Sequence, residues 1–408
     1  MQLKLLFAVL FAVGAAAADW SCIGPFGGPA MSVAASPSNP QILYASPQGY
    51  PTPMLKSTDG GSSWKPAGSM GYYAFNISVH PTNPDNVIAA IGSIVRTTNG
   101  GTQWNYATVP GGTYARGLAR GLSDPQRAYT TGYVYLNSNT RFGVNVSTDG
   151  GATWDSVCVD TTIYGNGYAI AVSPTDPNIV YAGGYPGNGA TANTVVYKST
   201  DGGSTWAKNL TGINGYWVYA ATVSSADPNV VLCGTNTGGI IRSTDAGATW
   251  SVATSQYNIQ AIAEVPSNPA LLYAASDTAL LRSSDTGRTW VNTGGIPGKS
   301  IRSVGATGAS SATVFCATRD GIYRSLTAGG NWQLRTGDVA LAKVSAIGIP
   351  TADPRTLYAE YKDNAVYKST DEGATWNRLP DFLSCGSLCG IVIDRNNPQV
   401  IWTLEGSG

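Results

Sequence analysis

The chain has 408 residues, and 24 Lys and Arg balance 24 Asp and Glu, so its formal net charge is zero. Such a neutral composition excludes the basic surface that nucleic acids or anionic membranes require. The 50 glycines, 23 prolines and 22 tyrosines favour short strands joined by tight turns. The composition therefore predicts an all-β protein with no nucleic-acid partner.

The N-terminus has the three parts of an export signal. Lys4 is its only charge, Leu5–Val13 is apolar, and Ala16–Ala18 offers a small-residue cleavage site. The apolar run is short for a membrane span, and no second run of spanning length follows. We predict a signal peptide over 1–18 and a secreted product, extracellular or periplasmic, that does not span a membrane. Residues 19–408 are predicted to form one domain.

One short motif recurs along the chain. STDGGSSW at Ser57–Trp64 returns as STDGGATW at Ser147–Trp154, as STDGGSTW at Ser199–Trp206 and as STDEGATW at Ser369–Trp376. Aligned on the tryptophan, eight copies stand 40 to 52 residues apart. They end at Trp64, Trp104, Trp154, Trp206, Trp250, Trp290, Trp332 and Trp376. Periods of this length indicate a repeat architecture.

A second motif precedes most of these copies, as in SPSNPQILYAS (36–46) and SPTDPNIVYAG (173–183). It is an apolar strand, a proline turn and another strand. Each unit therefore has four strands, which is typical of a β-propeller blade. We predict eight complete antiparallel blades and half of a ninth, which the N-terminal segment 20–25 would complete beside 400–405. The alternative is that this segment completes a neighbouring molecule, which would give self-association into filaments.

The recurring turn is interpreted as structural. Its aspartate carboxylate can accept hydrogen bonds from the backbone N–H groups of the turn, and its glycine supplies the positive φ of a tight hairpin. A catalytic group would not be needed in every blade. The structural aspartates are Asp59, Asp149, Asp201, Asp245, Asp285 and Asp371.

The motif resembles the Asp-box of the BNR repeat. That repeat is shared by sialidases, family 74 xyloglucanases, the sortilin ectodomain and photosystem II assembly-factor propellers. The resemblance covers 19–408 and implies the fold, but one fold hosts many functions. The Arg-Ile-Pro motif of sialidases is absent from the sequence. Family 74 enzymes place two aspartates between tandem propellers, whereas this chain is long enough for one.

Glycoside hydrolysis needs two carboxyl groups roughly 5–10 Å apart. Most acidic residues here belong to the box or to turns. The remaining weak catalytic candidates are Glu264, which replaces an apolar residue of a strand, and Glu360 with Asp363, which share one variable segment. Displaced polar residues are the simpler interpretation of all three.

Aromatic residues gather in the segments that vary between repeats. In a propeller these segments share the face opposite the box turns, and aromatics on a rigid scaffold suit the binding of a polysaccharide or a protein surface. The predicted ligand-binding residues are Tyr72, Tyr73, Tyr133, Tyr164, Tyr168, Tyr185, Tyr216 and Trp217. The alternative is that they pack among the loops or border the central channel.

The cysteines divide into two kinds. Cys233 and Cys316 replace small residues of strands and are predicted to be buried. Cys22, Cys385 and Cys389 are candidates for a disulfide. One histidine and no Cys-x-x-Cys pair argue against zinc, and no cofactor is predicted.

A basic residue precedes most box serines, and its stem is expected to cover apolar sheet edges while its charge stays in water. These residues are Lys56, Arg96, Lys198, Arg242, Arg282, Arg324 and Lys368. Together these features favour a secreted, non-catalytic propeller that binds a glycan or a protein. The alternatives are a secreted glycoside hydrolase of the family 74 or sialidase-like type and an assembly factor that docks on a membrane complex.

Overall fold

The computed structural model describes most of the chain. The described residues are 30–48, 53–109, 114–136, 139–160, 166–185, 193–215, 217–265, 268–277, 279–293, 301–307, 313–318, 321–334, 344–348, 356–361, 365–370, 377–379, 387–393 and 401–406. The predicted signal peptide and the segment 20–25 lie outside them.

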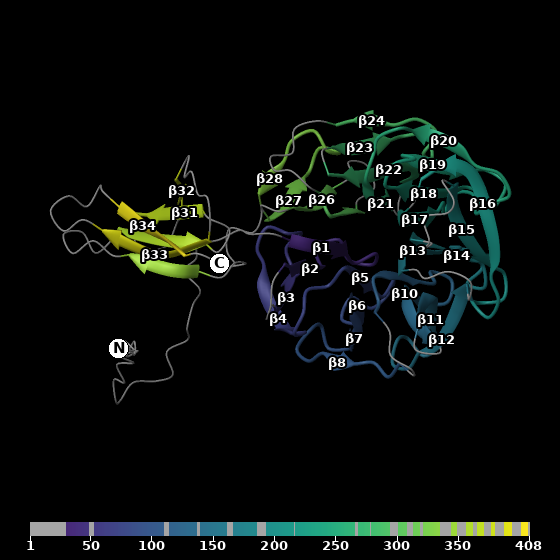
Figure 1. Cartoon of the computed structure of the whole chain (residues 1–408), viewed down its shortest axis with the longest axis horizontal. Helices are drawn as coiled ribbons and strands as arrows, with labels where there is room; N and C mark the ends of the chain where they lie inside the picture. The colour runs from purple at the N-terminus through teal and green to yellow at the C-terminus, as the bar shows by residue number, and fades with distance from the viewer. Residues whose placement is uncertain are drawn as a thin grey trace.

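Seven four-stranded antiparallel sheets form a ring of blades (Figure 1). Blade 1 has β1 (Ala30–Ala35), β2 (Leu43–Pro47), β3 (Pro53–Ser57) and β4 (Lys65–Ser69). Blade 2 has β5 (Asn76–Val79), β6 (Val87–Ile91), β7 (Ser93–Thr97) and β8 (Asn105–Tyr106). Blade 3 has β9 (Gly117–Arg120), β10 (Ala128–Leu136), β11 (Asn139–Ser147) and β12 (Asp155–Asp160). Blade 4 has β13 (Asn166–Val172), β14 (Val180–Tyr185), β15 (Asn193–Ser199) and β16 (Ala207–Asn214).

The remaining three blades follow the same plan. Blade 5 has β17 (Val218–Val223), β18 (Val231–Thr235), β19 (Ile240–Ser243) and β20 (Ser251–Thr254). Blade 6 has β21 (Ile259–Val265), β22 (Asn268–Ser276), β23 (Leu280–Ser283) and β24 (Val291–Asn292). Blade 7 has β25 (Ser303–Thr307), β26 (Thr313–Thr318), β27 (Gly321–Ser325) and β28 (Gln333–Leu334). The predicted all-β propeller of four-stranded blades is confirmed.

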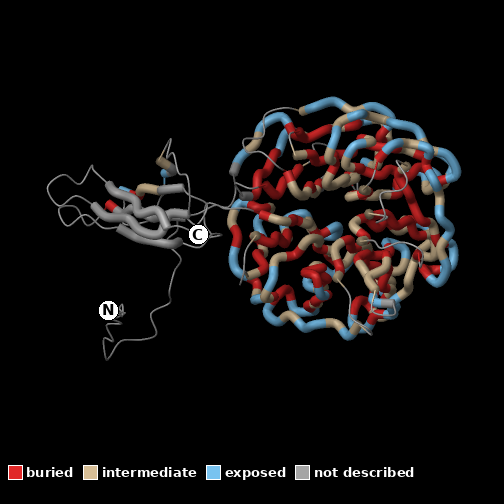
Figure 2. The backbone as a smooth tube through the Cα atoms, viewed as in Figure 1, coloured by how far each residue is buried: buried red, intermediate tan, exposed pale blue. Residues whose placement is uncertain are grey.

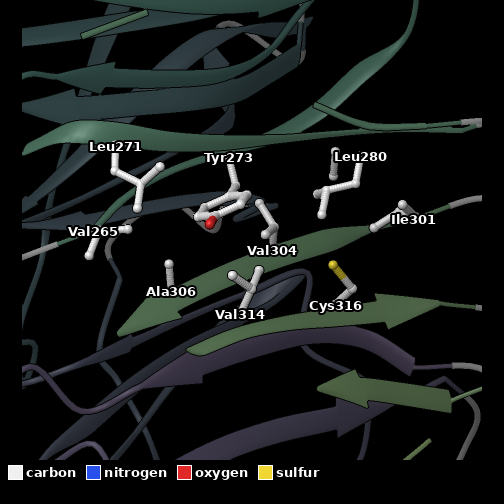
Figure 3. Close-up of a cluster of buried hydrophobic side chains, with 10 residues drawn as sticks. Val265, Leu271, Tyr273, Leu280, Ile301, Val304, Ala306, Val314 and Cys316 are labelled. Atoms are coloured by element: carbon white, nitrogen blue, oxygen red, sulfur yellow. The ribbon is translucent and has the colours of Figure 1, made fainter. Parts of the chain in front are cut away.

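Apolar side chains fill the space between neighbouring blades. The second strands β2, β6 and β18 are buried at every position, because both of their faces meet another sheet. Figure 2 shows this buried interior inside an exposed rim. Figure 3 shows one interface, where Tyr273 and Leu280 of blade 6 meet Val304 and Cys316 of blade 7.

The ring closes between the seventh blade and the first. Strand β1 contacts β25, β26 and β27, and Phe315 of blade 7 shares a core cluster with Leu55 and Trp64 of blade 1. The prediction of eight blades plus a partial ninth is therefore wrong. The number of repeats does not determine where a ring closes. The angle between packed sheets does, and here seven sheets complete the circle.

The eighth repeat lies outside the ring (Figure 1). It forms a four-stranded sheet of β29 (Val344–Gly348), β30 (Leu357–Tyr361), β31 (Ala365–Ser369) and β32 (Asn377–Arg378). The last hairpin is β33 (Ser387–Ile393) with β34 (Ile401–Gly406). Strand β29 contacts β33, just as β17 contacts β21 in the ring. These two sheets thus pack as successive blades, and residues 20–25 are not required to close the ring.

In the described part of the chain, no helix has the length and hydrophobicity needed to cross a membrane.

Candidate functional site

The box turns are closed by their own side chains. In blade 4, Ser199 Oγ donates to Asp201 Oδ1 at 2.7 Å, Thr205 N donates to the same oxygen at 2.9 Å, and Thr205 Oγ1 donates to Oδ2 at 2.6 Å. Gly203 N donates to Ser199 Oγ at 2.8 Å, and Gly203 has a φ of +89° that L side chains rarely adopt.

These hydrogen bonds stabilise the carboxylate form of the box aspartates. The bonds from Thr205 and Ser199 lower the pKa of Asp201 from 3.8 to about 2. Burial opposes such bonds at Asp59, Asp149 and Asp285, but their pKa values and that of Asp245 are also lowered to about 2. In blade 2 the amide of Asn99 accepts the equivalent bonds from Thr97 and Gln103. Asp371 lies outside the described residues. The five carboxylates are thus bonded within their own turns.

The opposite face of the ring carries a continuous group of aromatic rings. We call this group the aromatic surface, and its members are Tyr73, Phe75, Tyr114, Tyr133, Tyr135, Tyr168, Tyr185, Trp217 and Tyr219. On blades 2 and 3, the ring centroids of Tyr114 and Tyr133 lie 5.4 Å apart and stacked, and Phe75 lies 5.9 Å from Tyr114. On blades 4 and 5, Trp217 lies 5.6 Å from both Tyr185 and Tyr219 and 6.4 Å from Tyr168.

Arg116 joins the two halves of the aromatic surface. Its guanidinium carbon lies 4.8 Å from the ring centroid of Phe75, 5.2 Å from that of Tyr114 and 4.9 Å from that of Tyr168. Each such contact attracts the cation to the face of the ring. Arg116 therefore holds aromatic side chains of blades 2, 3 and 4 together in one surface.

Asparagines fix the backbone of Trp217. Trp217 N donates to Asn236 Oδ1 at 3.0 Å, and Asn236 N donates back to Trp217 O at 3.1 Å. Asn258 N donates to Asn236 O at 2.8 Å, and the Asn258 side-chain amide bonds the carboxylate of Asp277. Burial, then the charges of Tyr168 and Asp277, raise the pKa of Tyr219 to about 12. Through Asn258 and Asn236, Asp277 is thus linked to the backbone of Trp217.

The structure brings together five of the eight predicted binding residues: Tyr73, Tyr133, Tyr168, Tyr185 and Trp217. Tyr72, which precedes Tyr73 in the sequence, is 56% exposed. Tyr164 and Tyr216 lie outside the described residues. The residues predicted from the sequence do not include Phe75, Arg116 and Asp277. Arg116 lies two residues after Tyr114 in a variable loop, and Asp277 lies in the loop between β22 and β23. Their location in loops that vary between repeats is the sequence feature that could have indicated them.

The three catalytic candidates do not form a group in the described residues. Glu264 lies near the end of β21 and accepts the backbone N–H of Ser225 at 3.1 Å and the Ser225 hydroxyl. Burial raises the pKa of Glu264, and these hydrogen bonds oppose the shift. Glu360 lies in β30, outside the ring, with its backbone opposite Ala346 and Val366. Asp363 lies outside the described residues.

The buried cysteines are as predicted, since Cys233 and Cys316 are free and fully buried. Cys22 and Cys385 lie outside the described residues, and Cys389 is described only as a backbone position of β33. Within the described ranges, no group of three or more His, Cys, Asp or Glu side chains could hold a metal ion.

Comparison with known proteins finds partial sequence relatives and solved structures of similar fold. No family model matches the chain. It is 27% identical over 298 residues to a xyloglucanase of Hypocrea jecorina. The aligned region covers 63% of this chain and 31% of that protein. It is also 26% identical over 297 residues to a xyloglucanase of Paenibacillus sp. That aligned region covers 65% of this chain and 26% of that protein. The chain spans less than a third of the length of these curated relatives.

Two solved structures share the fold. An ancestral GH74 enzyme aligns with a TM-score of 0.72 and 17% identity over 93% of this chain and 58% of that one. YCF48 from Cyanidioschyzon merolae aligns with a TM-score of 0.51 and 18% identity over 74% of this chain and 96% of that one. The chain is therefore an Asp-box β-propeller, similar in fold to these proteins and in sequence to part of the xyloglucanases.

Proposed function

We propose that the chain belongs to a glycoside hydrolase that acts on a xyloglucan-like β-glucan, and that the aromatic surface binds the polysaccharide. The similarity to xyloglucanases supports the hydrolase alternative over the non-catalytic module that the sequence favoured. The single observation that carries the site is the continuous aromatic surface around Arg116.

The aromatic surface has the chemistry that sugars require. The C–H faces of a pyranose ring pack on aromatic rings, and hydroxyl groups need hydrogen-bond partners at the edges. Tyr133, Tyr168, Tyr185 and Trp217 are each partly exposed, so their rings combine a packed side with an accessible one. Arg116 and Asp277 place opposite charges among them. A glucan chain that lies across blades 2 to 6 would meet all of these groups.

Hydrolysis requires a second carboxyl group besides Asp277. The repeat offers one candidate by position, because SDTALLRS (276–283) in blade 6 corresponds to KDNAVYKS (362–369) in the eighth repeat, which makes Asp363 the counterpart of Asp277. Asp363 lies outside the described residues, and its repeat lies outside the ring. We therefore assign one carboxylate, Asp277, to catalysis and leave Glu264 to the fold.

The experiment is an assay of the full mature chain on soluble xyloglucan, with mannan as a control polysaccharide. The expected results are xyloglucan-specific retardation in affinity electrophoresis and release of reducing ends. Asp277→Asn should abolish release and retain binding. Binding without any release in the wild-type chain would reject the hydrolase and leave a binding module. Absence of both would reject the proposal altogether.

Export through residues 1–18 is part of this proposal, because a polysaccharide substrate lies outside the cell. The assembly-factor alternative is supported by fold likeness alone.

A further inference from the structure

Arg120 occupies a position that is apolar in blades 2, 4 and 5. It is the last residue of β9, one residue before the proline turn, and only 7% of it is exposed. Val79, Val172 and Val223 hold the same position in blades 2, 4 and 5. A guanidinium group has thus replaced a core valine between blades 2 and 3.

The hydrogen-bonding capacity of Arg120 is mostly unused. Its Nη2 donates to Asn86 Oδ1 at 3.3 Å, while its Nε and Nη1 are buried and have no partner among the described residues. The neighbouring Arg96 also has a buried Nε without a partner there. The nearest acidic residues in the sequence are engaged elsewhere, since Asp85 pairs with Lys56 and Asp124 pairs with Arg127.

Arg120 remains charged at neutral pH in this environment. Burial, followed by the charge of Arg96, lowers the pKa of Arg120 to about 10. Burial and the charge of Arg120 also lower the pKa of His80, whose Nδ1 accepts the N–H groups of Thr82 and Asn83. The site therefore holds buried positive charge, and a buried charge without a counter-charge is strongly unfavourable.

Blade 6 shows how the same position is satisfied when its charge is negative. Glu264 also stands one residue before the turn and bonds to the turn of the preceding blade. There the N–H and hydroxyl groups of Ser225 supply the donors that a carboxylate needs. Between blades 2 and 3 the situation is reversed, because the groups without a partner in the described part of the chain are N–H donors of Arg120 and Arg96. An anion could accept hydrogen bonds from them and balance their charge.

We propose that a small inorganic anion of about the size of chloride binds between blades 2 and 3, against the Arg120 guanidinium and beside Arg96. Its size is limited because Arg120 Nη1 is closed off from bulk solvent. The site is separate from the aromatic surface. Arg116 immediately precedes β9 and Arg120 ends it, so the two residues stand about 13 Å apart along the chain direction.

The test measures the melting temperature while chloride replaces gluconate at constant ionic strength. An anion that binds only the folded state raises this temperature with the logarithm of its concentration, once that concentration exceeds the dissociation constant. The expected rise is about 2–4 °C for the wild-type chain and for Arg288→Met, which removes an exposed arginine of a box turn. Arg120→Met should lose the response.

Two further measurements keep the proposal testable if Arg120→Met does not fold. Arg96→Met should raise the chloride concentration at which the melting temperature begins to rise. Crystals soaked in bromide should show an anomalous peak within hydrogen-bond distance of Arg120. The same chloride response in Arg120→Met as in the wild type, no chloride response in the wild type, or no bromide peak at Arg120 would each overturn the proposal.

Discussion

Arg324 of blade 7 donates through Nη1 to the backbone carbonyl of Gly60 in blade 1, across 264 residues of sequence. The corresponding residues link consecutive blades in the same way. Lys198 Nζ donates to Ala246 O at 2.8 Å, and Arg242 Nε donates to Thr286 O at 3.1 Å. The sequence predicts that these charges stay in water. Instead, Arg324, Lys198 and Arg242 each bond a backbone carbonyl in the box turn of the next blade. The bond from Arg324 shows that blade 1 follows blade 7 in the ring.

Arg324→Met should therefore destabilise the ring. Arg324 also donates to Ser62 Oγ at 2.9 Å, so the substitution removes two interblade bonds and keeps the apolar stem. The expected loss is about 1–3 kcal/mol in the free energy of unfolding, measured by urea denaturation. The exposed Arg288→Met serves as the control and should change little. Equal stability of both variants would contradict the assigned role of Arg324 in closure.

Acid should weaken the fold in a narrow pH range. The folded pKa of five box aspartates is about 2, below the ordinary value of 3.8. Their contribution is complete above the unfolded pKa and is lost as pH falls through the folded one. Stability should therefore be flat near neutrality and fall steeply from about pH 4 to about pH 2.

The effect of one box can be isolated with Asp149→Asn and Asp149→Ala. Asn99 shows that an amide can accept the turn's hydrogen bonds, so the asparagine variant should fold and unfold with a shallower dependence on pH. The alanine variant should melt at a lower temperature, because the N–H groups of Ala152 and Thr153 lose their acceptor. Identical pH profiles for wild type and Asp149→Asn would rule out this linkage.

Trp217→Ala should weaken the binding of xyloglucan by about tenfold or more. The side chain lies between Tyr168, Tyr185 and Tyr219, so its loss divides the aromatic surface on blades 4 and 5. Affinity electrophoresis measures the effect. Tyr106→Ala, which removes a 63% exposed ring from the outer strand of blade 2, is the matched control. Equal weakening by both variants would refute a local site.

Glu264→Gln should leave polysaccharide cleavage unchanged. Its hydrogen bonds join the turn of blade 5 to the inner strand of blade 6, at the end of β21 that leads into the proline turn. Reducing-end release should match the wild type, whereas Asp277→Asn should show none. Loss of release in Glu264→Gln, at unchanged melting temperature, would transfer the catalytic assignment to Glu264.

The sequence predicted the features that depend on local interactions. The Asp-box and the four strands recur in each unit. They could be predicted because the hydrogen bonds of each turn are made within eight consecutive residues, as at Ser199–Trp206. It did not predict the place of closure, because the contact between β1 and β25 depends on how sheets accumulate around an axis.

The same distinction applies to the aromatic surface. The tyrosines of the variable loops were visible as a composition bias, and five of the eight predicted binding residues meet. Arg116 was not selected, because its three ring contacts come from blades 2, 3 and 4 and have no common spacing in the sequence. Asp277 was not selected because a single aspartate in a loop becomes notable only when Tyr219 and Asn258 stand beside it.

The ring closes between β1 and β25 without a blade that combines strands from both ends of the chain. Every hydrogen-bonded ladder of the seven blades runs between strands that follow one another in the sequence. The seam is therefore made of side chains and turn contacts. Each sheet can form from one contiguous stretch of chain, with only the seam requiring distant residues to meet. A circular permutant that begins at β9 would cut no ladder, so the ring has no intrinsic first blade.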